Sequence, residues 1–136
     1  MDDSNYTLKL KLISMYPLVL FLIIILLGIK MNQNTMQEKN SFWIIYIVMG
    51  LVFMFRYLNM PKEIIVDNEL VTFKNWFGRE KAAYIKDLKK IQKRMSYITI
   101  STEEKRIVMP AGFADFKRFI EDMKKRNPGV EVVGVK

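Results

Sequence analysis

The sequence predicts an α+β protein: a two-helix transmembrane hairpin followed by a small antiparallel β-sheet domain with a C-terminal amphipathic helix. Three patterns predict it: two long apolar stretches, short β-branched runs between turn formers, and a phenylalanine stripe at helical spacing. We expect residues 1–60 to form the hairpin and residues 61–136 the domain.

The first apolar stretch, from Leu12 to Ile29, contains 18 residues without a charge. This length is near the lower limit for a helix that crosses a hydrocarbon core about 30 Å thick. A cleaved signal peptide is the alternative. The segment GIKMNQN, which follows the apolar run, lacks the small-residue pattern of a cleavage site, so a span is favoured.

The second apolar stretch, from Phe42 to Met60, contains one charge, Arg56, near its end. Aromatic residues stand at both ends, as in the interfacial belts of membrane proteins. A buried core helix is the alternative, but a domain of about 70 residues is too small to bury two such helices. We therefore expect two spans, joined by a 12-residue loop from Lys30 to Ser41.

The charges predict the orientation. Residues 59–136 contain 17 Lys and Arg against 11 Asp and Glu, a net charge of +6. The connecting loop has only Lys30 and Lys39. Because basic flanks stay inside, we expect a multi-pass protein of the cell membrane with both termini in the cytoplasm. A basic domain there would be attracted to anionic lipid headgroups.

Short β-branched runs follow Pro61 and indicate antiparallel strands. Two pairs flank polar turns and predict hairpins: Ile64–Val66 with Leu70–Phe73, and Tyr97–Ser101 with Arg106–Met109. Gly78 marks a further turn, after which KAAYI predicts a third strand.

One apolar stripe near the C-terminus predicts a helix that packs on this sheet. Its members are Phe113, Phe116, Phe119, Ile120 and Met123. Asp115 is expected in the first turn and Lys124–Arg126 in the last, as the helix dipole favours, and Asn127–Pro128 should end the helix.

The stretch from Glu80 to Met95 fits either a basic amphipathic helix or strands, because Ile85, Leu88, Ile91 and Met95 have helical spacing inside a β context. Two flanking segments are equally open. Tyr6–Leu12 alternates like a strand or extends the first helix, and Val130–Val135 is a last strand or a frayed tail.

The order of these segments resembles the bacterial pleckstrin-homology-like (PH-like) domains carried by small two-span membrane proteins. The resemblance is carried by IIVDNELVTFKNWFG, by YIKDLKKI at Tyr84–Ile91 and by FADFKRFIEDMKKRNP at Phe113–Pro128. It implies a PH-like antiparallel β-sheet or barrel, with strand, turn and strand across Glu80–Met95. Some small members of that family protect their host from membrane-active bacteriocins, so the resemblance also implies bacteriocin immunity.

Two candidate binding sites follow from the charges. The basic cluster consists of Lys86, Lys89, Lys90, Lys93 and Arg94. It suits lipid phosphates or an acidic protein face, and a solvated surface is the alternative.

The second candidate is the turn that contains Trp76, Phe77 and Arg79. Its rings suit the headgroup region of a membrane, with Arg79 meeting the phosphates. Core packing of the rings is the alternative.

Whole classes of chemistry are excluded by composition. The chain has neither cysteine nor histidine, so thiolate or imidazole metal sites and histidine-activated nucleophiles are absent. No glycine-rich phosphate loop occurs. We expect no enzyme, no cofactor, no metal site and no nucleic-acid partner.

The sequence therefore predicts a membrane-anchored binding module whose partners are anionic lipids, a membrane protein or a membrane-active peptide. The alternative is a structural or regulatory subunit of a larger envelope complex. Gly28 and Gly50 would then allow close helix packing, and oligomers could form through the helices.

Overall fold

The computed structural model describes residues 5–34 and 42–135 and divides the chain into two compact units. Residues 15–59 form one, which we call the helical unit. Residues 1–14 and 60–136 form the other, which we call the domain unit. The described residues 5–14 thus group with the domain, although we expected them in the hairpin.

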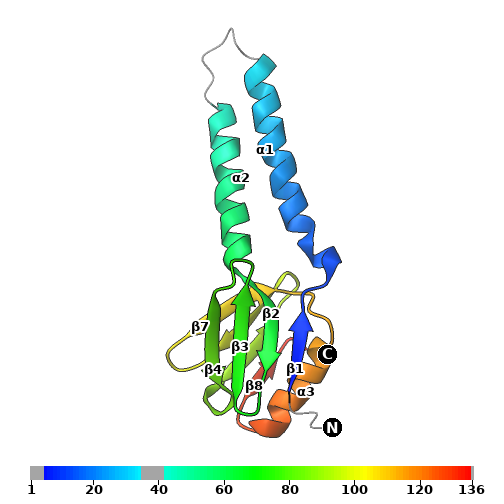
Figure 1. Cartoon of the computed structure of the whole chain (residues 1–136), viewed down its shortest axis with the longest axis vertical. Helices are drawn as coiled ribbons and strands as arrows, with labels where there is room; N and C mark the ends of the chain where they lie inside the picture. The colour runs from blue at the N-terminus through cyan, green and yellow to red at the C-terminus, as the bar shows by residue number, and fades with distance from the viewer. Residues whose placement is uncertain (1–4, 35–41, 136) are drawn as a thin grey trace. The chain divides into compact units, whose positions relative to one another are not determined.

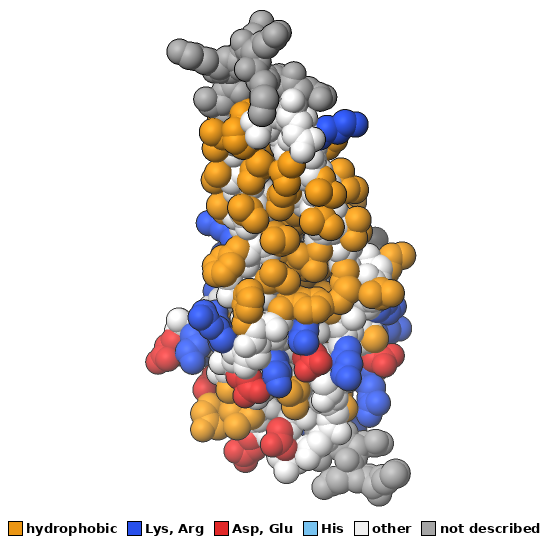
Figure 2. All heavy atoms as spheres, turned by 45° about the horizontal axis from the view of Figure 1, so that its top comes forward, with side chains coloured by type: hydrophobic (Ala, Val, Ile, Leu, Met, Phe, Trp, Pro, Cys, Tyr) orange, Lys and Arg blue, Asp and Glu red, His pale blue; other side chains and the backbone are white. Residues whose placement is uncertain are grey.

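The helical unit contains α1 (Tyr16–Asn34), which follows the 3₁₀ turn η1 (Leu12–Met15), and α2 (Phe42–Asn59). Among the described residues, one helix, Leu12–Gln33, is long and apolar enough to cross a membrane, and α2 is apolar but shorter. On the face shown in Figure 2, hydrophobic side chains cover this unit. The domain unit mixes hydrophobic, basic and acidic side chains on its surface.

Glycines let α1 and α2 pack closely. A Cβ at Gly28 would lie 2.8 Å from Cγ1 of Ile47, and one at Gly50 would lie 2.8 Å from Cγ1 of Ile25. The rings of Phe21 and Phe53 stack with centroids 5.7 Å apart. Close backbone approach of this kind is typical of helices that pair in lipid.

The predicted loop between the helices begins too early. Residues 30–34 continue α1, because Lys, Met and Gln are good helix formers even where the apolar run has ended. The rest of the predicted loop, residues 35–41 with Lys39, lies outside the described residues.

Eight described strands form two sheets in the domain unit (Figure 1). The first sheet has the order β1 (Tyr6–Lys9), β2 (Pro61–Val66), β3 (Leu70–Asn75), β4 (Glu80–Tyr84). The second has the order β7 (Arg106–Pro110), β6 (Tyr97–Ser101), β5 (Lys90–Lys93), β8 (Glu131–Val133). All neighbours are antiparallel except β5 and β8. Both predicted hairpins are confirmed.

Alternate residues of the strands build one core. Ile64, Phe73, Ile98 and Met109 are among its fully buried members. Helix α3 (Phe116–Arg126) closes this core with Phe116, Phe119, Ile120 and Met123. The predicted amphipathic helix is therefore confirmed, and it ends before Asn127 as expected.

The start of α3 differs from the prediction. Asp115 is the residue before the helix, with a left-handed φ of 56°, instead of a member of its first turn. Phe113 lies outside the helix and forms a β-bridge with Leu10. That pairing with the N-terminal segment takes Phe113 out of the helical register.

The ambiguous stretch from Glu80 forms strand, turn and strand: β4, the 3₁₀ turn η2 (Ile85–Asp87) and β5. The tight turn explains the helix-like spacing, because it places Ile85, Leu88 and Ile91 all in the core. The side-chain amide of Asn127 donates hydrogen bonds to the carbonyls of Ile85 and Leu88, at 2.8 and 2.9 Å, and so fixes η2 beneath α3.

Both open flanking segments are strands. β1 pairs with β2, and the Tyr6 hydroxyl donates a 2.8 Å hydrogen bond to Asp122 of α3. Burial raises the pKa of Tyr6 well above its ordinary value, and the hydrogen bond to Asp122 adds to the shift. β8 pairs in parallel with β5 after α3. The first strand is thus separated from its partner by the whole helical unit in sequence.

Candidate functional site

The predicted basic cluster is divided between the two ends of β5. Lys86 lies in η2 and Lys89 directly precedes β5, whereas Lys93 ends β5 and Arg94 follows it. A strand advances about 3.3 Å per residue and turns successive side chains to opposite faces. Residues adjacent in sequence are therefore spread along and around the strand.

Two lysines of the cluster pair with carboxylates. Nζ of Lys89 lies 2.9 Å from Oε1 of Glu103, and Nζ of Lys90 lies 3.1 Å from Oε1 of Glu131. The hydrogen bond to Glu103 raises the pKa of Lys89, and the same bond lowers the pKa of Glu103. Both side chains of that pair are exposed, so salt screens their attraction.

The other three cations lie over aromatic rings. Lys86 lies 5.4 Å from the ring centroid of Tyr84, Lys93 lies 5.8 Å from that of Phe116, and Arg94 lies 5.6 Å from that of Tyr97. These contacts leave the charged groups at the surface, where they can still meet an anion.

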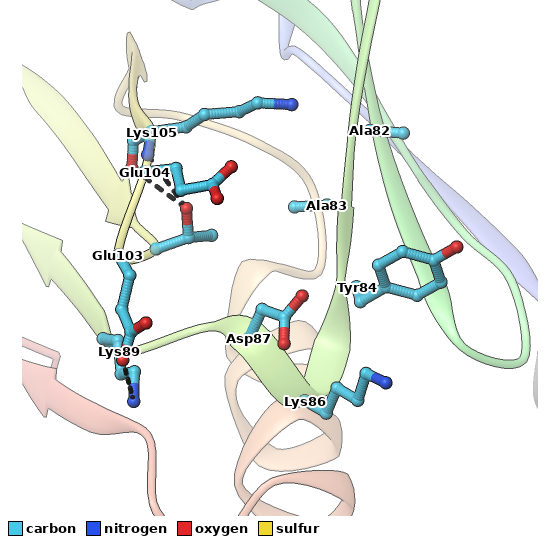
Figure 3. Close-up of a pocket in the computed structure, with 10 residues that line it drawn as sticks. Ala82, Ala83, Tyr84, Lys86, Asp87, Lys89, Glu103, Glu104 and Lys105 are labelled. Carbon is cyan, nitrogen blue, oxygen red and sulfur yellow. Dashed lines mark hydrogen bonds and ion pairs between the residues drawn. The ribbon is translucent and has the colours of Figure 1, made fainter.

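A groove of about 440 Å³ lies between the end of β4 with η2 and the β6–β7 turn. In Figure 3, Asp87 and Glu104 turn their carboxylates into it, and Lys105 reaches across towards β4. Tyr84 and Lys86 point away from Glu104 and Lys105. Because charges of both signs line the groove, it has no clear preference for an anion.

The second predicted site is the turn between β3 and β4, which side-chain hydrogen bonds hold in place. Oδ1 of Asn75 accepts hydrogen bonds from the backbone N–H groups of Phe77 (3.0 Å) and Arg79 (2.9 Å). Gly78 adopts the positive φ of 76° that the turn needs. We call this turn, residues 76–79, the first tip.

The rings of the first tip are placed differently. Trp76 is half-buried, and Nζ of Lys62 lies 5.0 Å from its ring centroid. Phe77 is 53% exposed although it is a large apolar side chain. Core packing therefore applies in part to Trp76, and Phe77 points outward.

Sequence reasoning did not single out Met95. It lies in the turn between β5 and β6, residues 94–96, which we call the second tip. Its side chain is fully exposed, with a relative accessibility of 101%. The backbone N–H of Arg94 donates a 2.8 Å hydrogen bond to the carbonyl of Tyr97 and closes this turn. The sequence feature that could have indicated it is a single methionine between the polar residues Arg94 and Ser96.

Metal ligands do not gather within the described ranges 5–34 and 42–135, where no group of three or more Asp, Glu, His or Cys side chains could hold an ion. The surface of the domain unit offers cations and exposed apolar side chains instead. These groups bind anions and apolar surfaces. Comparison with protein-family models, with curated proteins and with solved structures returned no match.

Proposed function

We propose that this chain is a non-enzymatic binding module anchored in the bacterial cell membrane by both helices, with a basic PH-like domain on the cytoplasmic side. The observation that carries the proposal is the helix Leu12–Gln33, which is long and apolar enough to cross a membrane. Several of its large apolar side chains, Leu20 and Leu26 among them, are at least half exposed. Lipid is the solvent that suits such a surface.

The strand pairing supports a second crossing. β1 precedes α1 and β2 follows α2, yet the two strands lie side by side in one sheet. Both flanks of the helical unit must then be on the same side of the membrane. If α1 crosses, α2 has to return. With 18 residues it is about 27 Å long, close to the thickness of a hydrocarbon core.

The charge of the domain supports a cytoplasmic, lipid-facing role. Residues 59–136 have a net charge of +6, and two sheets closed by an amphipathic C-terminal helix are compatible with the PH-like fold that the sequence resembles. Anionic headgroups of the inner leaflet are the partner that this charge suits best.

Membrane fractionation tests the anchorage. We expect the full chain to resist carbonate extraction and to need detergent, whereas a variant with a flexible linker in place of residues 15–59 should be released. Lipids that copurify with the full chain should be enriched in anionic species over the source membrane. Release of the full chain by carbonate would refute the proposal.

The immunity role implied by the resemblance is a narrower part of this proposal. Expression of the chain in a strain sensitive to membrane-active bacteriocins should raise survival, and the variant with the linker should not. Equal survival of the two strains would remove that role and leave the anchorage intact.

A further inference from the structure

We propose that one end of the domain unit lies against lipid headgroups, with Phe77 and Met95 inserted among them and Arg79 and Arg94 beside their phosphates. This end is where the chain passes to the helical unit, at Ser14 and Met60, and we call it the connection end. The inference rests on the anchorage proposed above. It specifies which surface of the domain meets the membrane.

The first tip is fixed to the connection end through β2. Pro61 begins β2 directly after Met60 and pairs with Asn75, the residue whose side chain holds the tip. Lys62 lies over the ring of Trp76. Phe77 therefore lies close to the point where the chain leaves the domain for α2.

The second tip is fixed to the same end through two backbone hydrogen bonds. The N–H of Ala111 donates to the carbonyl of Ser96 at 3.1 Å, and the N–H of Lys11 donates to the carbonyl of Gly112 at 3.0 Å. Lys11 directly precedes Leu12, where the apolar helix begins. Met95 is thus linked by a short hydrogen-bonded path to the start of that helix.

Exposed apolar side chains concentrate at this end. In the described part of the domain unit, six large apolar side chains are at least 36% exposed: Leu12, Ile13, Phe77, Tyr84, Met95 and Val108. Four of them, all except Tyr84 and Val108, belong to the connection end, and of these Leu12 and Ile13 also begin the helix that we assign to the bilayer. Side chains of this kind gain free energy when they enter the interfacial region of a bilayer.

Cations outnumber carboxylates at the connection end. The cations towards it are Lys9, Lys11, Lys62, Lys74, Arg79, Lys81, Lys93 and Arg94, and the carboxylates are Glu63, Glu80 and Asp115. Glu80 is also paired with Lys74, at 3.8 Å. The excess of positive charge complements an anionic leaflet.

The form of the surface favours lipid over a protein partner. Phe77 and Met95 protrude singly from two turns, each beside an arginine, and do not form one contiguous apolar face. An isolated apolar tip flanked by cations suits headgroups that rearrange around it. The chain itself continues from this end into a helix that we assign to the bilayer.

Site-specific labels in the full chain test the inference, since the sequence has no cysteine to remove. Single variants Phe77→Cys and Met95→Cys carry an environment-sensitive fluorophore in nanodiscs made with brominated anionic lipid. The matched controls are Tyr84→Cys and Val108→Cys, which are also exposed apolar positions. Leu20→Cys in α1 reports whether the anchorage itself exists.

We expect strong quenching at positions 20, 77 and 95 and at least about twofold weaker quenching at 84 and 108. Quenching at 20 but not at 77 and 95 would overturn the inference and leave the anchorage standing. Absence of quenching at all five positions would remove both.

The charges are tested with matched double variants. The charges should hold the label at position 95 among the headgroups. Arg79→Gln with Arg94→Gln should shift the equilibrium between inserted and water-exposed label towards the water-exposed form, by about fivefold for each cation lost. Lys86→Gln with Lys89→Gln removes the same charge from the predicted cluster and should change nothing. An equal effect of the two pairs would show that general charge, and not the connection end, attracts the lipid.

Discussion

The two ends of the domain unit contain similar kinds of residues in different arrangements. At the connection end, cations stand beside exposed Phe77 and Met95. At the opposite end, lysines face the carboxylates of Glu103 and Glu131. The difference teaches that a dense run of lysines in a sequence has to be judged from the neighbours that each lysine has in the fold. What matters is which groups the fold places beside each cation.

The two ends also differ in how the chain builds them. Turns of a few residues, such as Asp67–Glu69 and Thr102–Lys105, lie at the opposite end, where the side chains of Arg126 and Asn127 also bond to carbonyls of the β2–β3 turn and of η2. The connection end joins segments far apart in sequence: residues 10–14, 60–62 and 110–113 meet there through backbone hydrogen bonds. Changes in those segments should therefore cost more stability than changes in the local turns.

The largest effect is expected when β1 is lost. A chain without residues 1–10 loses Leu8, which is 2% exposed, and the hydrogen bond from Tyr6 to Asp122. We expect a loss of at least about 3 kcal/mol in the free energy of unfolding, or failure to fold, measured by denaturation in detergent.

The matched variant keeps β1 but replaces residues 15–59 with about eight Gly and Ser residues. The ends to be joined are close, because the N–H of Leu10 bonds to the carbonyl of Lys62 at 2.9 Å. This variant should fold. Equal stability of the two chains would show that β1 is dispensable.

A pair of glycines compares the two ends directly. Gly112, at the connection end, has a φ of 121°, and a Cβ there would collide with the side chain of Ser14. Gly112→Ala should destabilise the domain by about 2 kcal/mol. Gly129→Ala, where the nearest atom to an added Cβ is Oδ1 of Asn127 at 3.5 Å, should be close to neutral. Thermal unfolding of both variants measures the two losses of stability. Similar losses would contradict the view that the connection end is the more tightly packed one.

Tyr6→Phe should have a smaller effect of about 1–2 kcal/mol, because it removes a hydrogen bond to a carboxylate. The pKa of Tyr6 is raised in the folded state, so its contribution is complete below the ordinary value of 10.0 and declines as the pH rises above it. The native chain should therefore lose stability above pH 10 more steeply than the variant. Parallel pH curves for unfolding would exclude this role.

The smallest effect is expected at the exposed pair of Lys89 and Glu103. The pair stabilises the fold while both groups are charged. Its contribution is lost when the pH rises through the raised pKa of Lys89 or falls through the lowered pKa of Glu103. Between those limits Lys89→Gln should leave the unfolding midpoint unchanged at high salt and lower it slightly at low salt. A large loss at high salt would mean that the pair is not a simple surface contact.

Local patterns predicted most of the fold. The hairpin around Asp67 and Asn68, the strand Tyr97–Ser101 and the stripe of α3 are encoded within about ten residues each, so spacing and turn chemistry suffice. The pairing of β1 with β2 crosses more than 50 residues. No local pattern can reveal it.

The candidate site was less predictable. Phe77 stood out as an aromatic residue in a turn beside cations, and its exposure agrees with that interpretation. Met95 was not predicted as a site residue, because its spacing from Ile85, Leu88 and Ile91 is that of one face of a helix and indicated a core position. The 3₁₀ turn η2 and the short β5 produce that spacing and leave Met95 outside the core.

The most direct test of the account is the side of the membrane on which each flank lies. Single variants Asn5→Cys, Gln33→Cys and Asn68→Cys in intact cells are treated with an impermeant thiol reagent. We predict that position 33 reacts from outside, and that positions 5 and 68 react only after the membrane is opened. Reaction of 5 and 68 on opposite sides would contradict the shared sheet, and reaction of all three on one side would contradict the crossing.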